Sequence, residues 1–255
     1  MLSQHIKKYL RQLQQKKFRN EYGEFLVEGI KGVAEALASA YALSMIVFEE
    51  AKKDDAPIKA IMKEAEKRSV PILFCGNKDI AGIKTTETFP GVLAVIKQKN
   101  IAKEDLSHGP ILCLDGIQDP GNLGTIIRTA DWFGIRNMVL SHDCVDAYNP
   151  KVVRSTMGSL FRTAVYESPA VLSDLLFFKE QGYAVIGFDA SGKNTLSDIV
   201  PSDKIVYVFG SESHGIRDEL LSLCDGTYRI PGENTAESLN VGVAVGIVLY
   251  EIAKK

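Results

Sequence analysis

The 255-residue sequence is poor in cysteine and contains no CxxC pair. Cys75, Cys113, Cys144 and Cys224 are widely spaced, so neither a disulfide framework nor a thiolate zinc site is indicated, and we expect reduced thiols. A long apolar run is also missing. The longest uncharged apolar segment, residues 241–250, is about half of the ~20 residues that a membrane-spanning helix requires. We therefore expect a soluble, cytoplasmic protein that does not engage a membrane.

The signatures of several common enzyme classes are absent as well. No GxGxxG follows the first strand pattern, and neither a Walker A lysine loop nor a GxSxG elbow is found, so the dinucleotide-binding, NTPase and hydrolase classes lose support. The stretch SHDCVD, residues 141–146, holds four candidate metal ligands in one loop without a second ligand group. We expect no bound metal.

Negatively charged side chains are absent from the N-terminal segment, because the first 20 residues contain no Asp or Glu. They carry six cations: Lys7, Lys8, Arg11, Lys16, Lys17 and Arg19. Such a density suits a polyanion such as nucleic acid, and the alternative is a solvated helix face.

Short apolar segments alternate with helical patterns along the whole chain, which predicts an α/β protein. Strands are expected at residues 25–29, 44–48, 72–76, 92–97, 111–115, 137–141, 163–167, 183–188, 204–210 and 227–231. The six strands expected after residue 110 alternate with helices, which predicts a mostly parallel sheet that is covered on both faces. Residues 101–108 lack apolar periodicity, so we expect a linker between a small domain of residues 1–100 and a second domain of residues 109–255.

Three loops of the second half follow expected strands, where free backbone amides and helix N-termini can meet a ligand. The first loop, in DGIQDPGNLGTIIRTADWFG, carries Asn122, a candidate helix N-cap, and Arg128, about a turn and a half into the helix. A cation near a helix N-terminus opposes the macrodipole, so we expect an anionic neighbour, with an ordinary surface arginine as the alternative.

The second loop, FGSESHGIRDELL, sets Gly210, Glu212 and Gly215 around a turn into a helix. Glycines let the backbone approach a ligand closely, although ordinary turn chemistry explains them equally well. His214 in the same loop is interpreted as a solvated or capping residue.

The third loop leaves a strand at Pro231, and Ser238 and Asn240 precede an apolar helix. Both polar residues are also typical helix caps. Gly242 and Gly246 each cost roughly 1 kcal/mol of helix propensity, and glycines so placed are useful where another backbone comes close. The sequence therefore predicts that this helix packs tightly.

Taken together and in this order, the three loops resemble the motifs of the SpoU (TrmH-like) RNA methyltransferases of the SPOUT superfamily. The resemblance is carried by Asn122-Leu123-Gly124 with Arg128-Thr129-Ala130, by Gly210-Ser211-Glu212 with Gly215, and by Ile230-Pro231 leading to Ser238-Leu239-Asn240-Val241. The stretch NPKVVRSTMGSLFR is similar to the family's segment between the first two motifs, and LRQLQQKKFRNEYGEFLVEG to its N-terminal substrate-binding domain. One departure is Gly232, where many relatives carry methionine.

The resemblance implies a C-terminal methyltransferase domain with a trefoil knot, a homodimer, and a smaller N-terminal α/β RNA-binding domain similar to a ribosomal protein. It implies S-adenosylmethionine as the cofactor and methylation of a ribose 2′-hydroxyl in RNA, with large-subunit rRNA favoured over tRNA. The alternatives are a tRNA 2′-O-methyltransferase, a base methyltransferase, and a catalytically silent RNA-binding or ribosome-assembly protein of the same fold.

The resemblance also implies functional residues. The expected catalytic residues are Arg128, Asn122, Glu212, Ser238 and Asn240. The expected cofactor-binding residues are Gly210, Ser211, Glu212, Gly215, Ile230, Pro231 and Leu239. RNA contacts are expected from the basic residues Lys7, Lys8, Arg11 and Arg19, and from Arg154. Because a guanidinium with a pKa above ~12 rarely releases its proton, we expect Arg128 to stabilise the forming alkoxide, with Asn122 and Glu212 holding its geometry.

Overall fold

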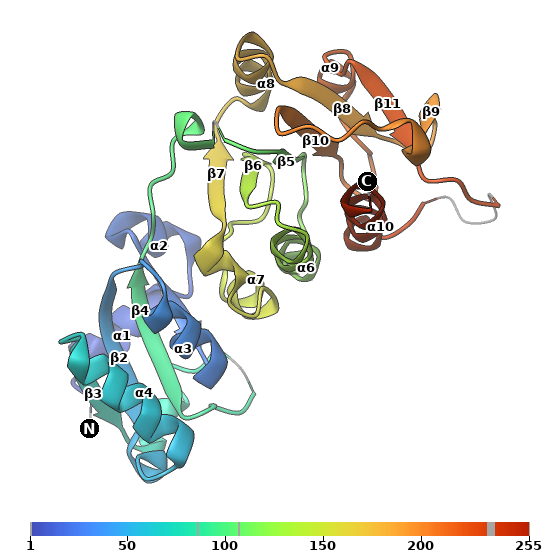
Figure 1. Ribbon diagram of the computed structural model, residues 1–255. Coiled ribbons are helices and arrows are strands. Elements are labelled where there is room, and N and C mark those ends of the chain that lie inside the picture. Colours follow the sequence, from blue (N-terminus) through green and yellow to red (C-terminus); the bar gives the residue numbers. More distant parts are fainter. Residues whose placement is uncertain (1, 86, 107, 234–237, 255) are drawn as a thin grey trace. The chain divides into compact units, whose positions relative to one another are not determined.

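The computed structural model describes residues 2–85, 87–106, 108–233 and 238–254 (Figure 1). The chain divides into two compact units, which are unit 1, residues 1–99 with 146–161, and unit 2, residues 100–145 with 162–255. Every strand expected from the sequence is present, with its bounds shifted by at most two residues, and the α/β prediction is confirmed. Only the short strand β9 (Asn194–Thr195) was not predicted.

Unit 1 contains a four-stranded sheet in the order β1–β4–β2–β3. Its strands are β1 (Glu24–Glu28), β2 (Leu43–Glu49), β3 (Ile72–Cys75) and β4 (Val92–Lys97). Its helices are α1 (Gln4–Gln12), α2 (Lys16–Tyr22), α3 (Ile30–Ala38), α4 (Ala56–Lys67), α5 (Asn77–Ile80) and α7 (Pro150–Ser155), with a 3-10 turn at Glu50–Lys52. In α1, Leu10 is fully buried and packs with Leu26 and Val47 of the sheet.

Residues 146–161, which lie between two strands of the second half, pack in unit 1. Helix α7 contacts β1, and the Phe25 ring lies 4.6 Å from that of Tyr148 and 6.5 Å from that of Phe161. Aromatic pairs at such distances add to the burial of apolar area. The packing of unit 1 therefore depends on a segment that is distant in the sequence.

Residues 146–161 are anchored to the rest of unit 1 by an ion pair that is shielded from water. The side chain of Arg19 is 2% exposed, its Nε donates to Asp146 Oδ2 at 2.8 Å, and its Nη2 donates to the same oxygen. Its Nη1 donates to the backbone oxygen of Leu13 at 3.1 Å. The prediction that Arg19 binds an RNA phosphate is therefore wrong, because this guanidinium is buried and already bonded.

Unit 2 contains a seven-stranded sheet in the order β7–β6–β5–β10–β8–β11–β9, and each pairing in the described chain is parallel. Its other strands are β5 (Ile111–Leu114), β6 (Asn137–Ser141), β7 (Ala164–Ser168), β8 (Ala184–Phe188), β10 (Ile205–Phe209) and β11 (Gly226–Arg229). Its helices are α6 (Pro120–Trp132), α8 (Val171–Glu180), α9 (Asp218–Leu221) and α10 (Val241–Ala253), with 3-10 turns at Lys103–Leu106 and Leu196–Asp198. A further 3-10 turn, Ser159–Arg162, falls at the end of the segment that belongs to unit 1.

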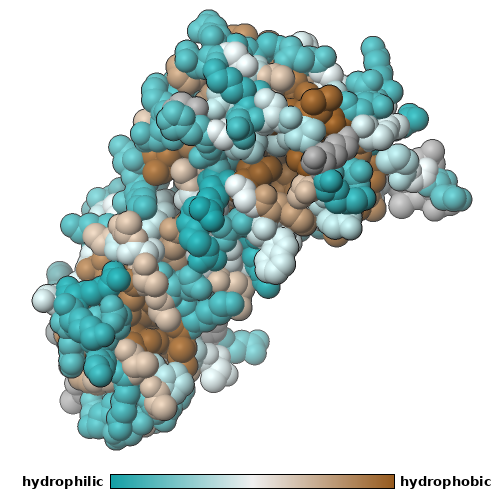
Figure 2. Space-filling model, viewed as in Figure 1, coloured by the Kyte–Doolittle hydropathy of each residue, from teal (hydrophilic) through white to brown (hydrophobic). Residues whose placement is uncertain are grey.

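Helices cover both faces of this sheet, as predicted. Helices α8 and α9 lie on one side, and α6 and α10 lie on the other (Figure 1). Leu175 of α8 and Leu220 of α9 are fully buried against strand residues such as Val206. In the space-filling view, each unit exposes apolar residues among its hydrophilic surface (Figure 2).

The strand order of unit 2 places a topological switch between β5 and β10. The chain runs from β5 outward through β6 to β7, then crosses to β8 on the other side, and β10 later enters between β5 and β8. Ligands bind at such switch points because neighbouring loops there leave the sheet in opposite directions. The carboxyl ends of β5 and β10 are therefore the expected position of a site.

None of the helices in the described residues combines the length and apolar character that a membrane span requires. All four cysteines are free thiols. Burial raises the pKa of Cys75 and of Cys224 to about 11, so both are protonated and poorly nucleophilic at neutral pH.

We expect Arg19→Leu to lower the free energy of unfolding by about 3–5 kcal/mol, because Asp146 is left buried without its partner. Urea unfolding followed by circular dichroism measures this loss. Lys8→Ala, at an exposed cation of the same segment, is the control and should change stability by less than about 0.5 kcal/mol. Equal stability of the two variants would contradict a structural role for Arg19.

Candidate active site

A cavity of about 750 Å³ opens at the carboxyl ends of β8, β10 and β11. Its volume lies within the roughly 300–1,000 Å³ that is common for ligand sites. The residues that the sequence predicted to bind a cofactor all line it: Gly210, Ser211, Glu212, Gly215, Ile230, Pro231 and Leu239. Ser238 lines it too. The structure thus brings together residues from two of the three predicted loops in one cavity.

Two backbone hydrogen bonds between Ser211 and Gly215 close the loop after β10 into a tight turn. Ser211 N donates to Gly215 O at 3.1 Å, and Gly215 N donates to Ser211 O at 2.9 Å. A Cβ on Gly210 would lie 1.9 Å from the carbonyl carbon of Gly215, so only glycine fits there. Turn geometry therefore explains Gly210, and the same tight turn exposes backbone to the cavity.

Gly232, the departure from the family pattern, also lines the cavity. A Cβ at this position would meet nothing within 4 Å in the described structure. The backbone at Gly232 therefore has room for a larger side chain, and the glycine leaves the cavity wider here.

A hydrogen-bond chain joins all three predicted loops. Asn240 Nδ2 donates to Asn122 Oδ1 at 3.0 Å, and Asn122 Nδ2 donates to Glu212 Oε1. These residues belong to the third, first and second loops, and 118 residues separate the two asparagines. The structure thereby brings together three of the five predicted catalytic residues.

The expected role of Asn122 as a helix N-cap is wrong. Helix α6 begins at Pro120, and its N-cap is Asp119, whose Oδ1 accepts from Asn122 N at 2.9 Å. Asn122 consequently stands inside the first turn, and its side chain is free to reach the other loops. With this start, Arg128 lies a little over two turns into the helix rather than a turn and a half.

The N-terminus of α10 sets the direction of the hydrogen-bond chain. Asn240 is the N-cap, and its Oδ1 accepts from the backbone amides of Gly242 at 3.0 Å and Val243 at 3.3 Å. Its Nδ2 therefore points away from α10 as a donor to Asn122. Asn122 then presents its own donor to Glu212, which must accept. Three side chains are oriented by one helix cap.

Helix α10 packs on α6, but this contact does not require its glycines, because a Cβ at either position would make only an ordinary van der Waals contact with α6. Its glycines face α6, where a Cβ on Gly242 would lie 3.4 Å from Thr125 Cγ2 and one on Gly246 would lie 3.8 Å from Thr129 Cγ2. Asn122, Thr125 and Thr129 follow each other at spacings of three and four, so they share one side of α6. The helix pair holds Asn122 against α10.

Arg128 is exposed on α6, next to Thr125 by helical spacing. It makes no hydrogen bond or ion pair with any residue in the described ranges, and it does not line the cavity. The structure therefore does not join Arg128 to the chain of Asn240, Asn122 and Glu212. Its guanidinium is available to an anion from outside the protein.

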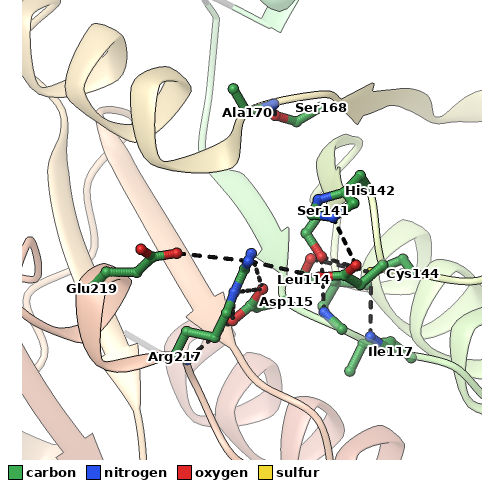
Figure 3. A network of polar contacts seen from close by, with 12 residues as sticks. Leu114, Asp115, Ile117, Ser141, His142, Cys144, Ser168, Ala170, Arg217 and Glu219 are labelled. Carbon is green, nitrogen blue, oxygen red and sulfur yellow. Dashed lines mark hydrogen bonds and ion pairs between the residues drawn. The ribbon is translucent and has the colours of Figure 1, made fainter.

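A second polar contact, which the sequence did not reveal, ties the loop after β10 to the end of β5. Asp115, which is 2% exposed, accepts from Arg217 N at 3.1 Å and from Arg217 Nη2 at 2.7 Å (Figure 3). The hydrogen bonds to Asp115 raise the pKa of Arg217 further. Asp143 and Glu219 each lie 3.7 Å from Arg217 Nη1. Arg217 is thus neutralised by carboxylates and holds two loops together.

The stretch SHDCVD continues this network. Gly116 N donates to Ser141 Oγ at 2.9 Å, and Cys144 Sγ accepts from Ile117 N and donates to Leu114 O, both at 3.3 Å (Figure 3). Over the described ranges, no three His, Cys, Asp or Glu residues are grouped so that they could hold a metal. Ser141 and Cys144 of this stretch support the loop after β5, whereas Asp146 bonds Arg19.

The remaining residues that were predicted to bind RNA lie in unit 1. Lys8, Arg11 and Arg154 are exposed, and Arg11 Nε also donates to Gly82 O at 2.8 Å. Lys7 is only 18% exposed and pairs with Asp79 at 3.1 Å. The exposed residues are available to a phosphate, whereas Lys7 must first leave its carboxylate.

In the hydrogen-bond chain, Asn122 is the donor and Glu212 the acceptor. The substitution Asn122→Asp replaces this donor by a carboxylate that faces Glu212. Repulsion raises the pKa of one of the two carboxyls in the folded state, so stability falls as the pH rises above the ordinary Asp and Glu range. We expect a loss of about 1 kcal/mol at pH 7.5 that disappears near pH 4, measured by thermal unfolding at both pH values. Gln118→Glu, at an exposed position of the same loop, is the control. An equal loss at both pH values would contradict the contact.

Comparison with known proteins identifies the family. The chain matches the SpoU rRNA Methylase family over residues 109–250 and the MRM3-like substrate binding domain over residues 4–94. It is 33% identical over 249 residues to an uncharacterized tRNA/rRNA methyltransferase of Synechocystis, covering 97% of this chain and 90% of the relative. It is 32% identical over 245 residues to the 23S rRNA (guanosine(2553)-2′-O)-methyltransferase of Bacillus subtilis, covering 95% and 93%.

A solved structure agrees with this assignment. The AdoMet-bound rRNA methyltransferase from Sinorhizobium meliloti is similar with a TM-score of 0.87 and 28% identity, over 100% of this chain and 96% of that one. The family match, the two relatives and the fold all lead to one assignment. The chain belongs to the SpoU rRNA methylase family and joins an N-terminal substrate-binding domain to a C-terminal methyltransferase domain.

Proposed function

We propose that this protein transfers the methyl group of S-adenosylmethionine to a ribose 2′-hydroxyl of large-subunit rRNA. The observation that carries the proposal is the hydrogen-bond chain Asn240–Asn122–Glu212, which gathers the three motif loops beside a cavity. The relatives support the substrate and cofactor: the Bacillus subtilis protein is named a 23S rRNA 2′-O-methyltransferase, and the Sinorhizobium meliloti structure contains AdoMet.

The cavity suits such a cofactor. Ile230, Leu239 and Phe188 offer apolar walls for an adenine ring, and the glycine turn at Gly210 brings the backbone close enough for hydrogen bonds to it. Carboxylates in the lining suit a cationic sulfonium and an ammonium group. When bound, the cofactor supplies an electrophilic methyl group.

Methyl transfer forms a carbon–oxygen bond to the ribose and breaks the carbon–sulfur bond, with oxygen, carbon and sulfur in line, and the hydroxyl proton is released to solvent. Positioning can contribute about 7–11 kcal/mol to such a step in favourable systems. The rigid helix cap at Asn240 and the packing of α10 on α6 give Asn122 and Glu212 the fixed positions that this requires. Ser238, beside the third loop's cofactor residues, is proposed to order the same site.

Arg128 is proposed to stabilise the charge that develops on the 2′-oxygen and to bind the adjacent phosphate. Its exposure and its lack of partners in the described ranges leave the guanidinium available for both contacts. Its role is electrostatic, because a guanidinium rarely acts as a base.

We propose further that the active form is a homodimer with the knotted chain path of the superfamily. Val243 is 52%, Ile247 37% and Tyr250 55% exposed, and their spacing places these apolar side chains on one face of α10. Trp132, at the end of the neighbouring α6, is 84% exposed. A patch of this kind on a globular unit is typical of an interaction surface.

The function is tested by incubating the protein with tritiated S-adenosylmethionine and ribosomal RNA. We expect label in large-subunit rRNA and one new nucleotide that resists alkaline cleavage, because 2′-O-methylation removes the nucleophile of that cleavage. Label in tRNA would favour the tRNA alternative, and label without alkali resistance would favour base methylation. Absence of label from every RNA would favour the catalytically silent alternative.

We expect Arg128→Lys to lower the rate of methyl transfer at least about tenfold while cofactor affinity is retained, because lysine cannot make a planar bidentate contact. Single-turnover kinetics and isothermal titration measure the two quantities. Arg136→Lys, at a cation that is 62% exposed beyond α6, is the control and should leave both unchanged. Wild-type turnover in Arg128→Lys would exclude bidentate recognition.

The exposed cations of α1 are proposed to contact phosphates without reading sequence. In Lys8→Ala with Arg11→Ala, we expect weaker RNA binding at low salt and a slope of log K against log salt that is shallower by about one per side chain. Lys63→Ala with Lys67→Ala, on the exposed side of α4, is the control. An unchanged slope in the α1 variant would contradict phosphate binding there.

The proposed dimer is tested with Val243→Glu, which places a charge in the exposed apolar face of α10. We expect the wild-type protein to sediment as a dimer and this variant as a monomer, because an unpaired buried charge opposes association. Lys254→Glu, at the polar end of α10, is the control. A monomeric wild-type protein would contradict the dimer.

A further inference from the structure

Asp189 is the first residue after β8, and it lines the cavity next to the loop that follows the neighbouring strand β10. Its backbone is held on both sides: its N–H donates to Tyr228 O at 3.0 Å, and Gly192 N donates to its carbonyl oxygen at 3.0 Å. The side chain therefore starts from a fixed point at the carboxyl edge of the sheet.

The two carboxylate oxygens of Asp189 have different surroundings. Oδ1 accepts from Ser191 N at 2.8 Å and from Ser191 Oγ at 2.5 Å, which closes a local turn. Oδ2 accepts no hydrogen bond from any residue in the described ranges. It lies 3.3 Å from the point where a Cβ on Gly215 would stand, so it lies beside the loop after β10, and both residues line the cavity.

The local turn accounts for the hydrogen bonds that Asp189 Oδ1 accepts, but it gives Oδ2 no donor. An ionised carboxylate has about four acceptor positions, and a ligand that fills the cavity must either leave Oδ2 without a donor or supply one. Fixing Oδ1 on Ser191 orients Oδ2 in advance, so little conformational entropy opposes a bond to a ligand. The chemistry needed from the ligand is a hydroxyl or ammonium donor near its centre.

A ribose supplies two neighbouring hydroxyl donors. An acidic residue at the end of a parallel strand binds ribose hydroxyls in other nucleotide sites that lie at the carboxyl edge of a sheet. Because Asp189 lies next to Phe188, which lines the same cavity, an adenine ring on the apolar wall would bring its ribose toward Oδ2. The ammonium group of the amino-acid part is the competing donor.

We propose that Asp189 Oδ2 accepts a hydrogen bond from the ribose hydroxyls of the methyl donor and so selects a ribonucleoside cofactor. This assignment rests on the proposed function, since it names one contact of the cofactor in the same cavity. Asp189 acts in binding and specificity, and Ser191 acts as its positioning residue.

Isothermal titration with two ligands tests the contact without any methyl transfer. The ligands are S-adenosylhomocysteine and its 2′,3′-dideoxy analogue, which share the adenine and the ammonium but differ in the hydroxyls. We expect the wild-type protein to bind the hydroxylated ligand at least about tenfold more tightly, as for loss of a hydrogen bond to a charged group.

Asp189→Asn is the matched variant, because an asparagine Oδ1 can still accept from Ser191 while its amide replaces the acceptor Oδ2 by a donor. We expect its affinity for S-adenosylhomocysteine to fall at least about fivefold and its affinity for the dideoxy analogue to stay within about twofold. Glu233→Gln removes a different carboxylate of the cavity and should leave the ratio of the two affinities unchanged. Ser191→Ala should lower the ratio less than Asp189→Asn does.

The proposal is overturned if Asp189→Asn weakens both ligands equally, because the carboxylate would then act on the ammonium or on the loop. It is also overturned if the wild-type protein does not distinguish the two ligands, an outcome that needs no variant. If the wild-type protein binds neither ligand, the cofactor assignment of the proposed function fails first. Tight binding of both ligands with equal affinity would instead leave the proposed function intact and reject only the role of Asp189.

Discussion

The insertion of β10 between β5 and β8 is the constraint on which the candidate site depends. Because the strands are parallel, their carboxyl ends share one edge, and loops that are about 90 residues apart in the chain become neighbours. The pair of the buried Asp115 and the partly exposed Arg217 ties two of these loops together where they leave the sheet. Removal of Arg217 would leave the buried carboxylate of Asp115 without its cation, so the pair holds the two loops in one arrangement.

The second feature of the site is that rigid elements orient its polar groups. The N-cap of α10 directs Asn240 toward Asn122, and Asn122 toward Glu212. Packing of α10 on α6 keeps the two helix starts together. A methyl transfer that relies on alignment benefits from such preorganisation, because no reorganisation is needed when the substrates meet.

In unit 1, basic residues that are close together in the sequence have different structural environments. Arg19 is buried and bonds Asp146, whereas Lys8 and Arg11 are exposed on α1. Charge density together with the family resemblance predicted all three as RNA contacts, because a sequence pattern carries no information on which side chains a distant segment covers. Only the exposed ones are available to contribute to the salt dependence of RNA binding.

The sequence by itself determined the strands, the alternation of helices with them and the residues of the three motif loops, because apolar periodicity and turn chemistry act over a few neighbouring residues. Tertiary structure decided the rest. The partners of Arg19, Asn240 and Arg217 lie 127, 118 and 102 residues away, and no local pattern encodes such pairings. For the same reason, the place of Asn122 inside α6, the packing of residues 146–161 in unit 1 and the Asp189 oxygen that accepts nothing from the described residues became visible only in the fold.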